Sequence, residues 1–445
     1  MKLFRTLPLI AAMSLAFSGA VQGQSLVEMY ESAKDFDASF KSAQLQVQAS
    51  RLKILQAQAR LGMNVNLNAN VNQNYGGYTT PSTSSFPGNH SYTNQTGTVT
   101  GTQQIYRPGT NIEVAQTELQ MRQIQAQLQA AEQDLMVRLS QAYFDVLAAQ
   151  DNLTFIQAQM KAVAEQLASA KRNFEVGTAT ITDTREAQAS YDLARAQEIA
   201  ALNDLRVKKM ALDQLVGKQE LSPKPVAVNA KAIAPTPDRV DTWVGLSEGQ
   251  NPTVKQLRTG LEIADLEVRK AQAGLKPTVD AQLSYSYSNS NGAINAASTD
   301  IKYGVATGAV VLNWPLYSGR SLENRVRETM SLKLKAEADL DATSRNVAQS
   351  TRSAFYGVLS GISQISALEA AEESSKVALD ANKLGYSVGV RININVLDSQ
   401  SKLYDTKAKL AKARYDVLVG LLKLRQVSGV LNMEDLQNIN SLLTP

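Results

Sequence analysis

Two long intervals of the chain, 109–222 and 316–444, contain no proline, and this limits the possible folds more than any other feature. Both are rich in Ala, Gln, Leu, Glu, Lys and Arg, the residues with the strongest helix propensity. In the first interval an apolar residue recurs at every seventh position from Val114 to Ala170. This heptad spacing is typical of helices that pack along their length as coiled coils.

Glycine divides the first interval into two helices. Gly177 is the only glycine between Gly109 and Gly217, so it marks the place where one helix ends and another begins. The sequence predicts helices over 111–176 and 183–216, and in the second half over about 320–384 and 395–427. A helix over 111–176 would be roughly 100 Å long at ~1.5 Å per residue.

The two halves of the chain resemble one another. Three segments of the first half recur in the second, at an offset of 212 or 214 residues: "LQAQARLGMNV" (55–65) in "RKAQAGLKPTV" (269–279), "AYFDVL" (142–147) in "AFYGVL" (354–359), and "FEVGTATITDTREAQ" (174–188) in "YSVGVRININVLDSQ" (386–400). Because this period is too long for a solenoid repeat, it indicates the duplication of one large unit. The predicted organisation is a first repeat over 24–220, an inter-repeat segment over 221–250, a second repeat over 251–429 and a tail over 430–445.

Each repeat also contains a pair of predicted strands. In "MNVNLNANVNQNY" (63–75) apolar residues alternate with amides, so the two kinds of side chain point to opposite faces of a strand. The other strands are expected at about 92–106, 279–288 and 303–317. Such strands fit either a soluble sheet with one wet side or a membrane barrel with a wet lumen. Four strands cannot close a membrane barrel, so two, three or four copies would have to contribute eight, twelve or sixteen strands.

The N-terminus directs the chain out of the cytoplasm. Lys2 and Arg5 precede an apolar core over 7–17 and then small residues, which is typical of a signal peptide over 1–23. No later segment approaches ~20 consecutive apolar residues, and the absence of cysteine excludes lipidation and thiol chemistry. The formal charge of +4 includes both basic residues of the signal, so the mature chain has no electrostatic support for binding nucleic acid.

These features together resemble the TolC family of outer membrane channel-tunnel proteins. The resemblance rests on the paired turns "VGTATITD" and "VGVRININVLDSQ", on "SGR" after a Trp-Pro-Leu-Tyr strand end, and on the tandem halves. It implies a mostly α protein with β structure: a homotrimer whose twelve-stranded outer-membrane β-barrel, four strands from each protomer, continues into a long periplasmic helical barrel. The segments 221–250 and 430–445 would form an equatorial girdle around that tunnel.

The family resemblance also implies a function and partners. Such proteins are exit ducts in type I protein secretion or multidrug efflux, and they work with a periplasmic adaptor protein and an inner-membrane ABC or proton-driven transporter. No cofactor or metal is implied. An enzyme is disfavoured because the one histidine, His90, is expected in a loop and no catalytic or metal cluster accompanies it. A trimeric coiled-coil adhesin or structural envelope protein would explain the heptads, but not the two inserted pairs of strands.

The resemblance assigns the candidate gate to the two repeated turns. Carried over residue by residue, polar links there hold the resting tip closed through Thr182, Asp183, Tyr386 and Arg391, next to the turn glycines Gly177 and Gly389. Asp183 and Arg391 would form a charge-assisted pair, with Tyr386 as a phenolic donor to the same carboxylate. In the alternative interpretation, Asp183 caps a helix that begins near Thr184.

The candidate pore constriction lies just after the second turn. Family members carry two aspartates at the narrowest point, and the matching residues here are Asn395 and Asp398. A trimer would therefore have one ring of carboxylates beside one ring of amides, which predicts a cation-preferring pore. In the alternative interpretation, Asp398 is a solvated residue that pairs with Lys402 one helical turn later.

Overall fold

The computed structural model describes residues 23–76, 90–227, 234–291 and 301–444. The predicted signal peptide lies outside these ranges except for Gly23. The chain divides into two compact units. The first comprises Met1–Gln44, Gln127–Val254 and Thr343–Pro445, and the second comprises Leu45–Ala126 and Lys255–Ala342.

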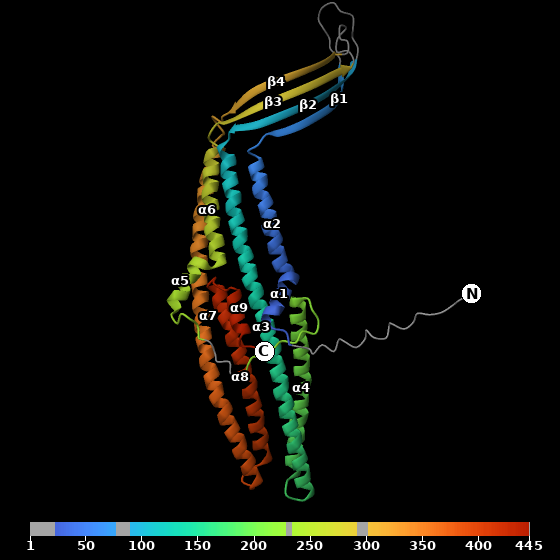
Figure 1. The fold of residues 1–445 in the computed structure, drawn as a ribbon, viewed down its shortest axis with the longest axis vertical. Helices are drawn as coiled ribbons and strands as arrows, with labels where there is room; N and C mark the ends of the chain where they lie inside the picture. The colour runs from blue at the N-terminus through green and yellow to red at the C-terminus, as the bar shows by residue number, and fades with distance from the viewer. Residues whose placement is uncertain (1–22, 77–89, 228–233, 292–300, 445) are drawn as a thin grey trace, which may run out of the picture. The chain divides into compact units, whose positions relative to one another are not determined.

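The described residues are mostly helical and form one sheet (Figure 1). In the first repeat the elements are α1 (Leu26–Phe36), α2 (Ala38–Ala59), β1 (Asn64–Gly76), β2 (His90–Tyr106), α3 (Pro108–Glu175) and α4 (Ile181–Val216). In the second they are α5 (Val240–Gln250), α6 (Pro252–Ala273), β3 (Thr278–Asn291), β4 (Ile301–Asn313), α7 (Ser321–Ser387), α8 (Asn393–Val427) and α9 (Met433–Asn440). The order α2–β1–β2–α3–α4 therefore recurs as α6–β3–β4–α7–α8, which agrees with the predicted duplication.

The longest helices contain 68 residues in α3 and 67 in α7. No proline interrupts these helices beyond the first turn of α3. None of the helices in the described ranges combines the length and the apolar character that a bilayer-crossing helix needs.

The sheet belongs to the second unit and has the strand order β1-β2-β3-β4, with all neighbours antiparallel. Its register places Leu67 opposite Val99, and Val99 opposite Tyr285, on one face. The other face carries amides and hydroxyls, and the Thr98 and Ser286 hydroxyls lie 3.0 Å apart there. One face of the sheet is thus mainly apolar, as the alternation over 63–75 predicts for β1, whereas the other is mainly polar over β1, β2 and β3 but carries Tyr303, Val305 and Val311 of β4.

Three details of the strands differ from the sequence prediction. The strand predicted to reach residue 317 ends at Asn313, because Pro315 has no amide hydrogen to donate to a strand ladder. Trp314 and Tyr317 therefore lie outside β4 and are exposed. His90, expected in a loop, is the first residue of β2 and pairs with Gly76.

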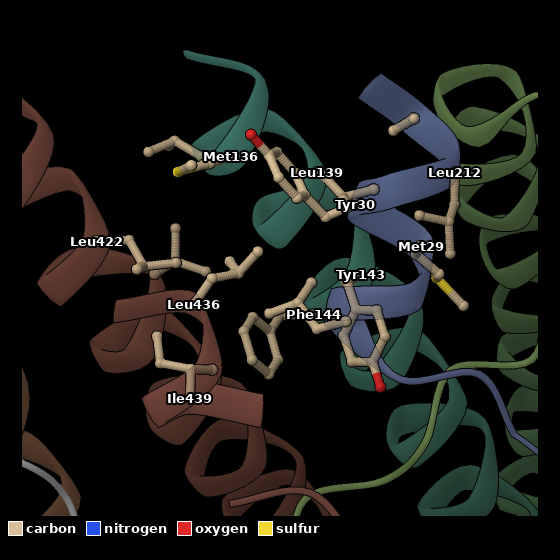
Figure 2. Packing of buried hydrophobic residues seen from close by; sticks show 14 of the residues in the cluster. Met29, Tyr30, Met136, Leu139, Tyr143, Phe144, Leu212, Leu422, Leu436 and Ile439 are labelled. Carbon is tan, nitrogen blue, oxygen red and sulfur yellow. The ribbon is translucent and has the colours of Figure 1, made fainter. Parts of the chain in front are cut away.

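The main hydrophobic core lies in the first unit. It joins residues of α1, α3, α4, α8 and α9, with Tyr143 and Phe144 of α3 at its centre (Figure 2). Figure 2 shows Phe144 between Leu436 and Ile439 of α9 on one side and Tyr143 on the other. The two rings meet edge to face at a centroid distance of 5.5 Å, a favoured aromatic geometry.

Isolated β-bridges join residues 223–226 of the inter-repeat segment to Gln24, just before α1, and to Leu443, just after α9. Gln24 bridges to Pro223, and Val226 bridges to Leu443. The buried Tyr143 hydroxyl donates to the Lys224 carbonyl at 2.8 Å, and burial raises the pKa of this phenol. Sequence positions that lie far apart are thereby fixed around α3.

Candidate functional site

The two turns that join α3 to α4 and α7 to α8 have the same backbone structure. In the first turn the amides of Thr178 and Ala179 donate to the Asn173 carbonyl at 2.8 and 3.1 Å. In the second, the amides of Val390 and Arg391 donate to the Gly385 carbonyl at 2.9 and 3.1 Å. These bonds satisfy carbonyls that the end of a helix would otherwise leave unpaired.

A glycine at the same place in each turn makes this geometry possible. Gly177 and Gly389 both have φ of +79°, in the left-handed region that other residues adopt only at a cost. Gly177 lies at the boundary between α3 and α4, where the sequence predicts one helix to end and the next to begin.

The helix that follows the first turn is capped by its own residues. Thr180 is the N-cap of α4, and its side chain accepts from the Asp183 amide at 3.1 Å. The Asp183 carboxylate in turn accepts from the amide and the hydroxyl of Thr180, at 2.9 and 2.8 Å. This is a capping box, in which each residue satisfies a donor of the other. The capping interpretation of Asp183 needs correction in detail, because α4 begins at Ile181 and Asp183 is its third residue rather than its N-cap.

The four predicted gate residues lie at these turns, but one chain does not join them. Thr182 is exposed, and the described residues contain no ion pair between Asp183 and Arg391 and no hydrogen bond between Asp183 and Tyr386. Arg391 is exposed, and its side-chain stem lies against Gly385, where a Cβ would approach the Arg391 Cγ to 2.7 Å. The Tyr386 ring packs on Leu379, Val396 and Leu403 within the α7–α8 hairpin.

The two predicted constriction residues lie in the first two turns of α8. Asn395 is half-buried, and its carbonyl accepts from the Ser399 hydroxyl at 2.7 Å. Asp398 is exposed and, among the described ion pairs, forms none with Lys402. The Asp398 carboxylate is therefore available to a solvent-filled space, whereas its neighbours Val396 and Leu397 are buried.

Sequence reasoning missed Asn393, the first residue of α8. Its side chain is fully buried; its Oδ1 accepts from Gln166 of α3 at 2.5 Å, and its Nδ2 donates to the Asp183 carbonyl at 3.1 Å. The available signal was the repeat itself, because the equivalent position 212 residues earlier is Ile181. The two copies of the turn therefore differ at this position, where the second has an amide and the first has an apolar side chain.

A cleft of about 930 Å³ lies in the first unit between α3, α7, α8 and residues 225–227. Its charged side chains already have partners: Arg414 pairs with Glu369 at 2.8 Å, and the Tyr415 hydroxyl donates to Asp151 at 2.7 Å. Burial raises the pKa of Asp151, although the Tyr415 hydrogen bond opposes this effect. Among the described residues no cluster of His, Cys, Asp or Glu could hold a metal ion.

Comparison with known proteins places both repeats in one family. The model of the family described as outer membrane efflux protein matches residues 29–218 and again residues 243–430. The outer membrane protein TolC of Vibrio cholerae is 30% identical over 444 residues, which cover 98% of each chain. The alkaline protease secretion protein AprF of Pseudomonas aeruginosa is 30% identical over 309 residues, which cover 68% of this chain and 63% of that one.

A solved structure has the same fold. The CmeC outer membrane channel of Campylobacter jejuni superimposes with a TM-score of 0.76 over 94% of this chain and 90% of its own, at 14% identity. The two matches of the family model coincide with the two repeats, and each match contains one of the two turns.

Proposed function

This chain belongs to the outer membrane efflux protein family, and we propose that its two repeated turns form the gate of an exit duct. The protein is an outer membrane channel of efflux and secretion, a passive conduit rather than an enzyme. The observation that carries the proposed gate is the duplicated hairpin, because each copy ends in the same glycine turn beside polar residues at a helix start.

We infer that three copies assemble into one channel. The sheet has four strands and two open edges, β1 and β4, whose backbone groups need partners in a lipid environment. Three sheets joined edge to edge would supply twelve strands, with Leu67, Leu283 and the rest of the apolar face toward lipid and the amide face toward water. The segments 221–250 and 430–445 would then lie at the equator, where α5 and α9 pack onto the long helices.

Proteins of this family work with periplasmic adaptors and inner-membrane transporters. For this chain we propose a periplasmic adaptor and an ABC or proton-driven transporter as partners, in type I secretion or drug efflux. The relative named for alkaline protease secretion supports the first route, and the family description supports the second.

At the gate, Thr182, Asp183, Tyr386 and Arg391 would hold the resting tip closed. Asp183 uses Oδ2 for the capping box, which leaves Oδ1 available to a further donor. Arg391 is exposed and has no acidic partner among the described ion pairs of one chain. A carboxylate that caps a helix can accept from a guanidinium as well, so the capping and linking roles of Asp183 are compatible.

At the constriction, Asp398 of three chains would form a carboxylate ring beside a ring of Asn395 amides. Carboxylates crowded in a narrow pore attract cations and repel anions. Single-channel reversal potentials in a salt gradient test this assignment. We expect Asp398→Ala to remove most of the cation preference, and Asn395→Asp to strengthen it and tighten block by multivalent cations.

Asp405→Ala is the matched control, because Asp405 is an exposed carboxylate of the same helix that already pairs with Lys409 at 2.7 Å. It should leave the reversal potential unchanged. If neither Asp398→Ala nor Asn395→Asp moves the reversal potential, the constriction lies elsewhere. If neither the purified protein nor its Tyr386→Phe, Arg391→Ser variant conducts ions in a planar bilayer, the channel function itself is refuted.

A further inference from the structure

Asn393 connects the two helical hairpins of the first unit at the start of α8. Its side chain makes two hydrogen bonds. The amide oxygen accepts from the Gln166 side chain of α3, and the amide nitrogen donates to the Asp183 carbonyl of α4. Both partners belong to the α3–α4 hairpin, whereas Asn393 belongs to the α7–α8 hairpin. A single side chain thus fixes the beginning of one hairpin arm against both helices of the other.

The surroundings of this link are apolar. Val163, Leu167 and Ala170 of α3 and Ala187 of α4 form one buried cluster with Leu397 of α8. These residues keep water away from the Asn393 side chain. If the hairpins separated slightly, the Asn393 amide would therefore lose its hydrogen bonds to Gln166 and Asp183 without gaining bonds to water. The link therefore favours one arrangement of the hairpins over all nearby ones.

The Asn393 amide does not support its own helix. The N-cap of α8 is Ile392, which makes no side-chain capping bond, and both polar atoms of Asn393 bond to the other hairpin. The equivalent residue of the first repeat, Ile181, is 49% exposed and contributes no such link. The amide is thus specific to the joint between the hairpins.

We propose that Asn393 is a positioning residue of the gate, a buried link that must break before the two hairpins move apart at the tip. The inference rests on the proposed gate function, and it adds to Thr182, Asp183, Tyr386 and Arg391 a residue that acts through Asp183 and Gln166. Asp183 would then contribute to the gate in two ways: its backbone carbonyl accepts from Asn393, and its carboxylate would accept from Arg391 and Tyr386.

The first test measures the conductance of the resting channel in planar bilayers. We expect Asn393→Ala to shift the equilibrium toward the open form by roughly tenfold per protomer, because two hydrogen bonds are lost together. Asn382→Ala is the matched control: the Asn382 amide also bonds a helix side chain, the Ser399 hydroxyl at 2.6 Å, but within the α7–α8 hairpin. It should leave the conductance at the level of the unaltered protein.

A second variant keeps the test decisive if Asn393→Ala fails to assemble. Asn393→Leu removes both bonds but retains the side-chain volume in an apolar cluster, so folding should survive while the gate loosens. Gln166→Ala should produce part of the effect, and the Gln166→Ala, Asn393→Ala double variant should be no more open than Asn393→Ala alone. Additive effects of the two substitutions would show that they do not act through a shared bond.

The outcomes separate this inference from the channel function. If the unaltered protein conducts and both Asn393 variants behave like Asn382→Ala, the link is structural only and the inference is overturned. If neither the unaltered protein nor any of these variants conducts after insertion, the proposed function fails first.

Discussion

The turn between α3 and α4 and the turn between α7 and α8 share a backbone but differ in how the next helix begins. Thr180 and Ile392 have nearly the same conformation, with φ and ψ of −87° and 160° against −100° and 161°. Thr180 closes a capping box with Asp183, whereas Ile392 makes no side-chain capping bond. The first helix start is therefore capped by its own residues, whereas the polar side chain at the second, Asn393, bonds to the other hairpin.

This difference shows what duplication allowed. Both copies kept the glycine and the carbonyl bonds that a tight turn between long helices requires. The α4 copy is capped locally, whereas the α8 copy has no side-chain cap and makes a contact with the other hairpin instead. A helix start whose polar bonds go to a neighbouring hairpin changes its stability when that hairpin moves, and this coupling is what a gate needs.

Of the substitutions that test this comparison of the two turns, removal of the two predicted links of the second turn should have the largest effect. We expect Tyr386→Phe combined with Arg391→Ser to raise the resting conductance several-fold, because the Asp183 carboxylate would lose both proposed donors. The measurement is single-channel conductance in planar bilayers. Unchanged conductance would leave helix capping as the whole role of Asp183.

Removing the cap of the first turn should have a smaller and more local effect. Thr180→Ala breaks the capping box and should cost about 1 kcal/mol in the stability of the first turn of α4. Hydrogen exchange of the Asp183 amide would report this loss as faster exchange. Thr178→Ala is the control, since the Thr178 hydroxyl donates to the Asn173 carbonyl at 3.0 Å and does not cap α4.

Supplying the missing cap should make the second turn resemble the first. Ile392 is 61% exposed, so Ile392→Thr removes little apolar contact, and its backbone already has the conformation of Thr180. We expect a gain of about 0.5 kcal/mol in the first turn of α8, seen as slower exchange of the Asn395 amide. If exchange there does not slow, the two helix starts differ in more than the cap.

Much of the fold was predictable because its signals are local. Proline-free stretches and the glycines at 177 and 389 placed the long helices to within a few residues, and the alternation over 63–75 gave the two faces of β1. The family resemblance was confirmed by a match over both repeats. The end of β4 was misjudged because aromatic residues after Asn313 read as a strand although Pro315 cannot donate to one.

The candidate site was less accessible to sequence reasoning. The sequence placed the gate residues at the turns, but the pairing of Asp183 with Arg391 and Tyr386 stays a prediction, because it depends on groups that one chain does not bring together. Asn393 was missed because its role comes from tertiary contacts with Gln166 and Asp183, more than 200 residues away in the sequence. The residues next to Asn393 in the sequence do not indicate which distant groups its amide will hydrogen-bond.

A third helix start, that of α2, supplies the smallest expected effect and a dependence on pH. Asp37 is buried; its Oδ1 accepts from the Phe40 amide at 2.7 Å, and its Oδ2 accepts from Arg138 at 3.1 Å. Burial by itself raises the pKa of Asp37, but these hydrogen bonds outweigh it and leave the pKa below its usual value.

The stabilisation of the folded state by the charged Asp37 is therefore present above the unfolded-state pKa of about 3.9 and is lost as the pH falls through the lower folded-state pKa. We expect Asp37→Asn to lower the thermal midpoint by about 1–2 °C at pH 7 and by less at pH 3. Asp134→Asn, which removes an exposed partner of the same arginine, should change it little at either pH. An equal loss at both pH values for Asp37→Asn would mean that the charge of Asp37 does not contribute to the stability of this helix start.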